Sequence, residues 1–246
     1  MSRLAMVGAL AGAAAACGAG FNAAEYSSPD SLYEASLSRY RDGHCGDAIV
    51  GLQRLTFELP PRDPRLAEVR FYLAECHRDQ GDRLEAARQF RRVADEFPQH
   101  ELAADALLHA GDANRDLWRN PELDPTYGDA ANALYRELLI RYPNSEAAGT
   151  ARERIAGLNE MFAEKEFKTG RFYMRLDAFD SAIIYFKAVV ERYPRTSYAP
   201  RALMRLVEAY REIGYVEERR EICNHLHQYY PDTPDLAEAC PADPTP

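Results

Sequence analysis

Histidine and carboxylate side chains are the first candidates for chemistry in this sequence, because they bind metals and transfer protons. His225 and His227, in the segment NHLHQ, are the closest pair among the six histidines. Two residues apart on a helix, they point from different faces and cannot share a metal as an i, i+4 pair could. The carboxylates at 216–222 lie beside no glycine-rich loop or nucleophile pattern, which is typical of a solvated helix face. We therefore expect no catalytic residue, no metal and no cofactor, and the chain is predicted not to be an enzyme.

Cys17 is a candidate for a different chemistry, the attachment of lipid. It follows thirteen residues of apolar character from Leu4 to Ala16, and Arg3 places one positive charge before them. Such a run is too short to cross a bilayer but suits the apolar region of a secretory signal. The ending AAAC resembles a bacterial lipobox, in which signal removal leaves the cysteine first in the chain for acylation, although Ala14 replaces the usual leucine. The alternative is ordinary signal cleavage before Cys17, which would release a free periplasmic protein.

The N-terminal region is therefore expected to have two parts. Residues 1–16 are predicted to be the signal peptide, and residues 17–29 the lipidated cysteine and a flexible tether, because residues 18–29 are mostly small and polar. Gly18 follows the cysteine, whereas an aspartate there often retains a proteobacterial lipoprotein at the inner membrane. That comparison favours the periplasmic face of the outer membrane, with membrane contact through the lipid anchor only.

The rest of the chain repeats a pattern of helices, and these helices must position any binding surface. The stretch LIRYPNSEAA at 139–148 returns as VERYPRTSYA at 190–199. Twelve residues before each repeated proline stands an alanine, and four residues after that alanine stands a bulky residue. The four sets are Ala48, Leu52 and Pro60; Ala86, Phe90 and Pro98; Ala131, Tyr135 and Pro143; and Ala182, Phe186 and Pro194.

Glycine precedes the alanine by five residues in the first two copies, at Gly43 and Gly81. A fifth copy has Gly214, but Arg219 replaces its alanine and Cys223 its bulky residue. The small alanine lets two helices approach closely, the bulky residue fills the gap one turn later, and the proline ends the second helix. Glycine, alanine, bulky residue and proline at these offsets are the tetratricopeptide signature. We therefore predict an all-α tetratricopeptide-repeat solenoid of about five helix hairpins.

Insertions lengthen this array at three places, the first of which is a longer turn, PPRD, at 60–63. The other two decide how the array is divided. Residues 116–129 form a loop in the third repeat, where Pro121 and Pro125 oppose helix and Trp118 is the only tryptophan. Between repeats three and four the apolar residues keep helical spacing without a strong break. This spacing predicts one long helix that joins two groups of repeats.

The domain boundaries follow from these two insertions. We expect the N-terminal repeats 1–3 in residues 30–144. The long joining helix, repeats 4–5 and a C-terminal cap are expected in residues 145–246. The chain has 30 basic and 39 acidic residues, a formal net charge of -9, and this balance argues against a nucleic-acid partner.

These features together resemble the BamD family of outer-membrane lipoproteins, components of the machinery that inserts β-barrel proteins. The resemblance runs from about Leu32 to Pro231 and is most specific in YGDAANALYRELLIRYPNSEAAGTARERI and GRFYMRLDAFDSAIIYFKAVVERYPRTSYAPRALMRLVEAY. It implies a lipid-anchored, non-catalytic scaffold that binds the periplasmic domains of the barrel-inserting protein and unfolded β-barrel clients. The alternative is a periplasmic tetratricopeptide adaptor for cell-wall or envelope-division enzymes.

Binding residues are expected on the first helix of each hairpin, which lines the inner groove of such a solenoid. Aromatic and arginine side chains there would supply most of the binding energy for an extended peptide. The predicted peptide-binding groove consists of Tyr33, Leu37, Tyr40, Arg41, Phe71, Glu75 and Arg78. The alternative is that Tyr33 and Phe71 are partly buried by neighbouring segments. In repeat four the same positions predict a basic partner-binding surface of Phe167, Arg171, Met174 and Arg175.

Four cysteines remain beyond Cys17, an even number in a compartment that permits disulfides. Cys45 and Cys76 stand at nearly equal distances from Pro60, and Cys223 and Cys240 from Pro231. Residues equidistant from the turn of an antiparallel hairpin lie opposite each other, so these two pairings are the predicted disulfides. The second pairing requires PDLAEAC to fold back as a short helix that caps the last repeat. The alternative is four unpaired, buried cysteines.

Overall fold

The structure is a computed structural model that describes residues 21–241. Those residues form eleven α-helices and one short 3-10 helix, and none of them is in a strand. The elements are η1 (Ala23–Glu25), α1 (Pro29–Arg41), α2 (Cys45–Glu58), α3 (Arg65–Asp79), α4 (Arg83–Glu96), α5 (Ala103–Arg115), α6 (Thr126–Arg141), α7 (Glu146–Met174), α8 (Phe179–Arg192), α9 (Tyr198–Glu212), α10 (Val216–Tyr229) and α11 (Leu236–Ala239).

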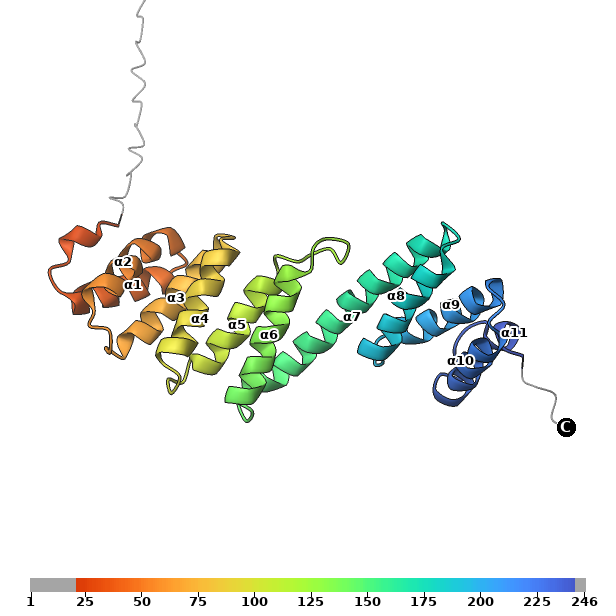
Figure 1. Cartoon of the computed structure of the whole chain (residues 1–246). Coiled ribbons are helices and arrows are strands. Elements are labelled where there is room, and N and C mark those ends of the chain that lie inside the picture. Colours follow the sequence, from red (N-terminus) through yellow and green to blue (C-terminus); the bar gives the residue numbers. More distant parts are fainter. Residues whose placement is uncertain (1–20, 242–246) are drawn as a thin grey trace, which may run out of the picture.

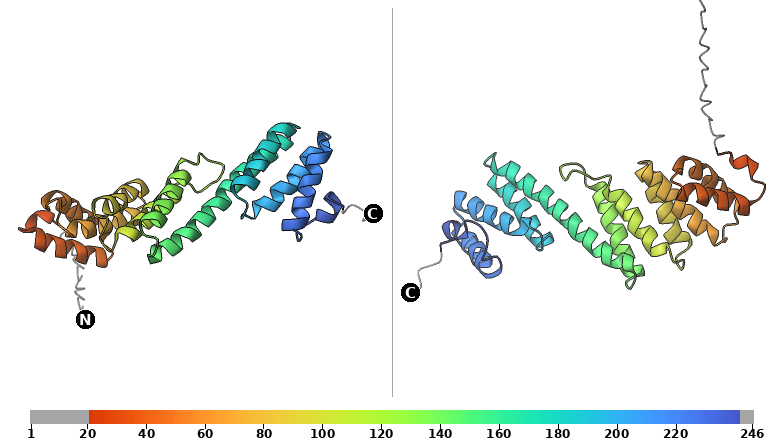
Figure 2. Two further views of the ribbon diagram at one scale, coloured as in Figure 1. Left: turned by 60° about the horizontal axis from the view of Figure 1, so that its bottom comes forward. Right: turned by 180° about the vertical axis from the view of Figure 1, so that it is seen from behind.

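Ten of these helices form five antiparallel hairpins, α1 with α2 through α9 with α10, stacked in chain order into an elongated array (Figures 1 and 2). Each second helix ends two residues before the proline of its repeat, as α2 does at Glu58 before Pro60. This position follows from chemistry, because proline excludes its predecessor from the α region. The predicted all-α repeat architecture is confirmed.

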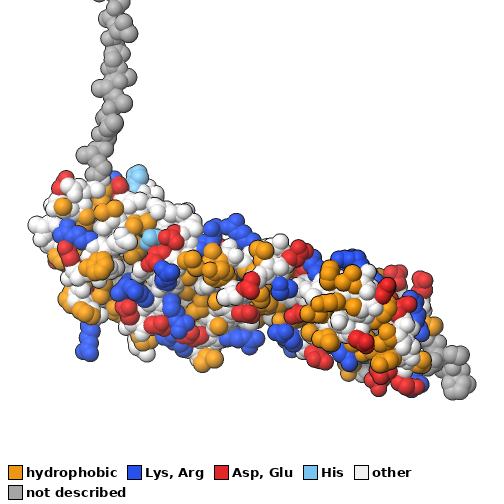
Figure 3. Space-filling view, turned by 45° about the horizontal axis from the view of Figure 1, so that its top comes forward, with side chains coloured by type: hydrophobic (Ala, Val, Ile, Leu, Met, Phe, Trp, Pro, Cys, Tyr) orange, Lys and Arg blue, Asp and Glu red, His pale blue; other side chains and the backbone are white. Residues whose placement is uncertain are grey.

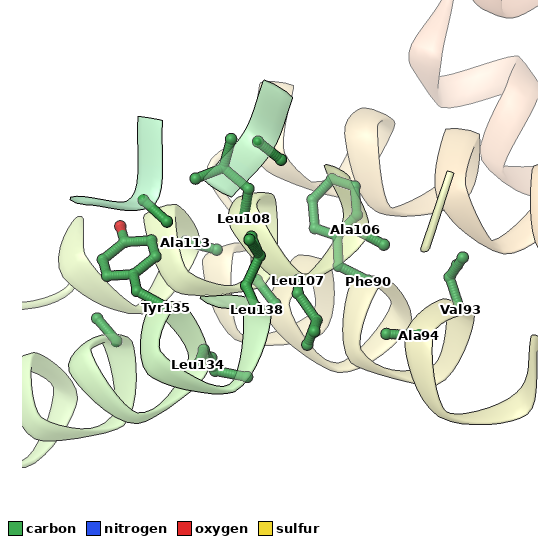
Figure 4. Packing of buried hydrophobic residues seen from close by; sticks show 14 of the residues in the cluster. Phe90, Val93, Ala94, Ala106, Leu107, Leu108, Ala113, Leu134, Tyr135 and Leu138 are labelled. Carbon is green, nitrogen blue, oxygen red and sulfur yellow. The ribbon is translucent and has the colours of Figure 1, made fainter. Parts of the chain in front are cut away.

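The alanine and the bulky residue of the first four repeats are fully buried between helices, as Ala86 and Phe90 illustrate with exposed fractions of 0%. Figure 4 shows Phe90 and Tyr135 among the leucines and alanines of the N-terminal core. Opposite two of the rings the first helix carries glycine. A methyl group on Gly111 would collide with the ring of Tyr135, and one on Gly170 would lie 2.6 Å from that of Phe186. The rings therefore occupy space that a larger residue on the facing helix would need.

The turn inside each hairpin needs a left-handed residue in four of the five repeats. Gly43, Gly81 and Gly214 have φ of 76°, 84° and 76°. Repeat four uses Asp177 at the same offset, with φ of 53°. Aspartate tolerates this conformation better than most residues that have a side chain, which explains why a search for glycine alone misses this turn.

The joining helix α7 is 29 residues long and bridges two separate apolar cores. Its N-terminal part, up to Phe162 and including Ala151, packs into the core formed by repeats two and three. Its second half, with Ala163 and Phe167, packs into the core of repeats four and five. The prediction of one long joining helix is confirmed, and none of its glycines breaks it.

The insertion is a loop only as far as Pro125, because α6 begins at Thr126, so the loop expected at 116–129 is four residues too long. This loop packs against the joining helix. Trp118 is buried, and its ring centroid lies 4.7 Å from that of Phe162 on α7. At the tip of the loop, Lys168 lies 3.0 Å from a carboxylate oxygen of Glu122, and Lys165 donates a hydrogen bond of 2.9 Å to the Leu123 carbonyl. The loop therefore links repeat three to the second half of α7.

The expectation of a flexible tether up to residue 29 is wrong for residues 21–28. Ala23 begins the short helix η1 and is buried, with an exposed fraction of 8%. Arg54 of α2 donates a hydrogen bond to its carbonyl. Phe21 and Tyr26 stack with ring centroids 5.6 Å apart. Small and polar residues have no hydrophobic periodicity, so this packing could not be predicted from composition.

The signal peptide expected at 1–16 and the acylated Cys17 lie outside the described residues. Within 21–241, no helix combines the length and the apolar character needed to cross a bilayer.

Two disulfides tie the ends of the array. Cys45 of α2 is joined to Cys76 of α3, and Cys223 of α10 is joined to Cys240 after α11, with Cα atoms 5.0 and 5.4 Å apart. The second bond holds α11 over the last hairpin, as the cap that the sequence predicts. Arg219, which replaces the usual alanine, donates a hydrogen bond of 3.1 Å to the Ala239 carbonyl. The two departures of repeat five from the pattern thus both contact the cap.

Candidate binding grooves

Two residues of the predicted peptide-binding groove, Tyr33 and Phe71, are core residues, with exposed fractions of 9% and 8%. The Tyr33 hydroxyl donates a hydrogen bond to Glu68. Burial is the larger cause, and the Glu68 carboxylate the second, that raises the pKa of Tyr33. The Phe71 ring packs against Phe90 and His109, with centroids 5.3 and 5.6 Å away. The assignment of these two residues as accessible anchors is therefore wrong, because their rings fill the space between neighbouring helices.

Glu75 of the same set is also buried, with an exposed fraction of 7%. Its carboxylate pairs with Arg78, and its other oxygen lies 2.7 Å from Nδ1 of His109. A buried carboxylate needs such partners to offset the loss of water. Glu75 therefore fixes Arg78 and the helix α5 beside it, and its oxygens are already occupied.

The accessible members of the predicted groove are Leu37, Tyr40, Arg41 and Arg78, which are half-buried or exposed. The Tyr40 ring packs against the Tyr72 ring, tilted by 43°, with ring centroids 4.7 Å apart. Burial is the first cause that raises the pKa of both hydroxyls, so both stay neutral at physiological pH. Repeat offsets select Phe71 and pass over Tyr72, the next residue, which faces Tyr40. We name Leu37, Tyr40, Arg41, Tyr72 and Arg78 the N-terminal groove.

A hollow of about 1060 Å3 lies in the second group of repeats. Its walls are the end of α7, one face of α9 and residues 229–239, the segment held by the second disulfide. Phe167 lies in its floor with an exposed fraction of 4%. The Arg201 guanidinium lies over the Phe167 ring, 5.0 Å from its centroid, and over the Tyr198 ring at 4.8 Å. We name this hollow the C-terminal groove.

Arginine is the commonest charged residue of the C-terminal groove, at positions Arg171, Arg201, Arg205, Arg211 and Arg219. Arg205 and Arg211 pair with Glu208 and Glu212. Among the described residues, no carboxylate lies within 4.0 Å of Arg171, Arg175 or Arg201. Free guanidinium groups beside an apolar floor can bind carboxylates and aromatic rings of a partner.

The four residues predicted on repeat four lie together at this site. Phe167 and Arg171 line the C-terminal groove, and Arg171, Met174 and Arg175 line a smaller adjoining hollow of about 330 Å3. A third hollow, of about 610 Å3, lies beside the insertion loop; it shares Arg171 with both of the others and Arg175 with the smaller one. Arg171 is therefore at the junction of all three.

The prediction missed the contribution of repeat five. The offsets that select Phe167, Arg171 and Met174 in repeat four select Met204, Glu208 and Arg211 in repeat five. All three line the C-terminal groove. Extending the same rule by one repeat would have found them, whereas the wall at 229–239 depends on the fold of the cap.

Opposite charges alternate along the face of the molecule shown in Figure 3, and neither sign forms a continuous surface there. In the described part of the chain no three histidine, cysteine or carboxylate side chains come together as a metal site would require. The guanidinium groups and aromatic rings of the C-terminal groove can bind polar and aromatic groups of a partner.

The family model described as "YfiO: Outer membrane lipoprotein" matches residues 25–234, nearly the whole described array. The chain belongs to this family. Its curated relatives bear the name outer membrane protein assembly factor BamD. The relative from Caulobacter vibrioides is 44% identical over 97 residues, 39% of this chain and 32% of that protein. One from Xylella fastidiosa strain 9a5c is 26% identical over 226 residues, 87% of this chain and 76% of that protein.

The matched segments differ in extent among these YfiO-family proteins. In the Caulobacter relative the match spans about a third of that protein's length, at 32%, and in the one from Vibrio cholerae it spans 39% at 36% identity. Among solved structures, a TPR repeats protein from Bacteroides fragilis superposes with a TM-score of 0.50 and 12% identity. That superposition covers 87% of this chain and 96% of the other, and it supports the repeat fold alone.

Proposed function

We propose that this chain is a lipid-anchored, non-catalytic scaffold for the assembly of β-barrel proteins into the outer membrane. The observation that carries the proposal is the unbroken match of the outer membrane lipoprotein family to residues 25–234. The name of the curated relatives, outer membrane protein assembly factor, supports the same role. A repeat array with accessible aromatic and arginine side chains at one end and an open groove at the other suits a protein that holds other proteins together.

The two groups of repeats are proposed to bind different partners. The N-terminal repeats, residues 30–144, present the paired rings of Tyr40 and Tyr72, which suit the aromatic end of an unfolded barrel strand. The second group, residues 145–246, presents in the C-terminal groove the guanidinium groups of Arg171 and Arg201, which have no carboxylate partner among the described residues. These groups suit an acidic segment in the periplasmic domains of the barrel-inserting protein.

The anchor is proposed to be an acylated Cys17 after removal of residues 1–16, with the repeats on the periplasmic face of the outer membrane. The family description as outer membrane lipoprotein supports it. Several acyl chains on one cysteine would hold firmly, because each buried methylene adds about 0.8 kcal/mol to membrane binding.

Co-purification tests the proposal. A tagged full-length chain is extracted from envelopes in mild detergent, its partners are identified by mass spectrometry, and the mass of its N-terminal peptide is measured. We expect the barrel-inserting protein as the major partner and an acylated Cys17. Recovery of cell-wall enzymes instead, with an unmodified Cys17, would contradict this function and support the periplasmic adaptor.

A further inference from the structure

The helix α2 carries two apolar side chains that the protein itself leaves in water. Phe57 is 87% exposed, the largest exposed fraction among the large apolar side chains of residues 21–241, and Val50 is 49% exposed. Arg54 stands between them, and the spacing 50, 54, 57 places all three on one face of the helix. We name Val50, Arg54 and Phe57 the α2 stripe.

The α2 stripe is also the face to which the start of the described chain is attached. Arg54 donates its hydrogen bond to the Ala23 carbonyl. Phe21 lies against Gly51 of the same helix, and the Arg39 guanidinium lies 5.7 Å from its ring centroid. Residue 21 is therefore fixed beside α2, at the end of the array formed by repeat one (Figure 1).

Only residues 18–20 stand between Cys17 and Phe21 in the sequence. Four peptide steps span at most about 14 Å when fully extended. If Cys17 is acylated, as the proposed function requires, the α2 stripe is thus held within a short distance of the lipid headgroups. A long flexible tether would allow the repeats to turn freely, but this one is too short for that.

The acidic side chains beside the α2 stripe are paired with arginines, which reduces their repulsion from a surface of lipid headgroups. Glu58 pairs with Arg54 at 2.7 Å, and Asp47 pairs with Arg39 at 3.6 Å. These two carboxylates are thereby compensated, and they oppose approach to anionic headgroups less than free carboxylates would. The Arg54 guanidinium is held by Glu58 and the Ala23 carbonyl, so its aliphatic stem is the part of the side chain that can lie along an apolar layer.

We propose that the α2 stripe rests on the lipid surface of the membrane, with Phe57 and Val50 in the boundary between headgroups and acyl chains. The short link to Cys17 and the stripe together give two attachment points, which fix the orientation of the repeat array relative to the bilayer. This inference rests on the proposed lipid anchor. It adds a protein contact to the lipid-only contact that the sequence predicts.

Quenching by brominated lipid tests the contact. The acylated full-length chain is reconstituted into vesicles of phosphatidylethanolamine and phosphatidylglycerol, with and without bromine on the acyl chains. Trp118, the only tryptophan of the chain, is buried at 1% exposure, so the unmodified chain supplies a constant background. Phe57→Trp adds a reporter on the α2 stripe. Ile140→Trp, at a position 80% exposed on α6, is the matched control.

We expect brominated lipid to reduce the additional emission of Phe57→Trp and to leave Ile140→Trp and the unmodified chain unchanged. Absence of quenching in Phe57→Trp, or equal quenching at both positions, would overturn the proposal. An emission shift of Phe57→Trp that depends on protein concentration and not on vesicles would assign the stripe to a second copy of the chain instead. The mass of the N-terminal peptide distinguishes failure of the lipid anchor from failure of the membrane contact. A chain without acyl groups overturns both the anchor and this inference. An acylated chain without quenching overturns this inference alone.

Discussion

Glycine residues on the helices of this protein differ in what a side chain would meet, and their substitutions should differ in sign. The Gly111 position faces the ring of Tyr135 in the core, whereas nothing lies within 4 Å of the corresponding position at Gly157. We expect Gly157→Ala to raise the free energy of unfolding by about 0.5–1 kcal/mol, because alanine loses less backbone entropy in a helix. We expect Gly111→Ala to lower it by about 1–3 kcal/mol through overpacking. Urea unfolding of both variants measures the difference, and equal shifts would contradict the packing described for repeat three.

Phe71 and Tyr40 separate stability from binding. Phe71→Ala should lower the free energy of unfolding by about 3–5 kcal/mol, because it leaves a cavity between α3, α4 and α5. Tyr40→Ala removes a half-buried ring and should weaken binding of an aromatic-ended barrel peptide by about 2 kcal/mol, roughly thirtyfold. Fluorescence titration measures the affinity, with Tyr215→Ala as the control on an exposed ring in the last repeat. Unchanged affinity in Tyr40→Ala would remove the N-terminal groove from the account.

At the scale of elements, α11 depends on a covalent bond as well as on packing. The bond between Cys223 and Cys240 closes a separation of 17 residues, for which the chain-entropy account gives a stabilisation of about 3 kcal/mol. Cys223→Ser with Cys240→Ser should lower the thermal midpoint and release the wall at 229–239 from the C-terminal groove. Calorimetry checks the first effect and limited proteolysis after residue 229 the second. Free thiols at both positions in protein isolated from the periplasm would contradict the pairing.

The end of α7 should decide the binding of an acidic partner. Arg171→Glu with Arg175→Glu reverses two exposed charges that have no carboxylate partner among the described residues, so the fold should tolerate the change. We expect at least a tenfold loss in recovery of the barrel-inserting protein. A tenfold change in affinity corresponds to about 1.4 kcal/mol of binding free energy, which one charged contact can contribute. Arg152→Glu, on the same helix but outside the three hollows, is the matched control. Equal recovery from both variants would move the site elsewhere.

At the scale of the whole molecule, the helices could be predicted because the repeat offsets encode direct steric effects. Proline ends each second helix and a small residue faces each bulky one, so the hairpins and the joining helix follow from the sequence. The grooves follow less well. Phe71 and Tyr72 are neighbours in the sequence, but the first ring is in the core and the second is accessible. The repeat offsets do not distinguish the two. The packing of residues 21–28 and the wall at 229–239 arise from contacts between distant segments, which local patterns do not contain.

Depletion of the protein from its own host tests whether the chain is needed to assemble β-barrel proteins in the outer membrane. The measured quantity is the amount of folded β-barrel proteins in the outer membrane. Their resistance to unfolding in cold detergent reports this amount while the chain is depleted and then restored. The account predicts that folded barrel proteins decline together while inner-membrane proteins keep their levels, and that the restored full-length chain reverses the decline. Unchanged folded barrel proteins after complete depletion, with disturbed cell-wall synthesis in their place, would contradict it.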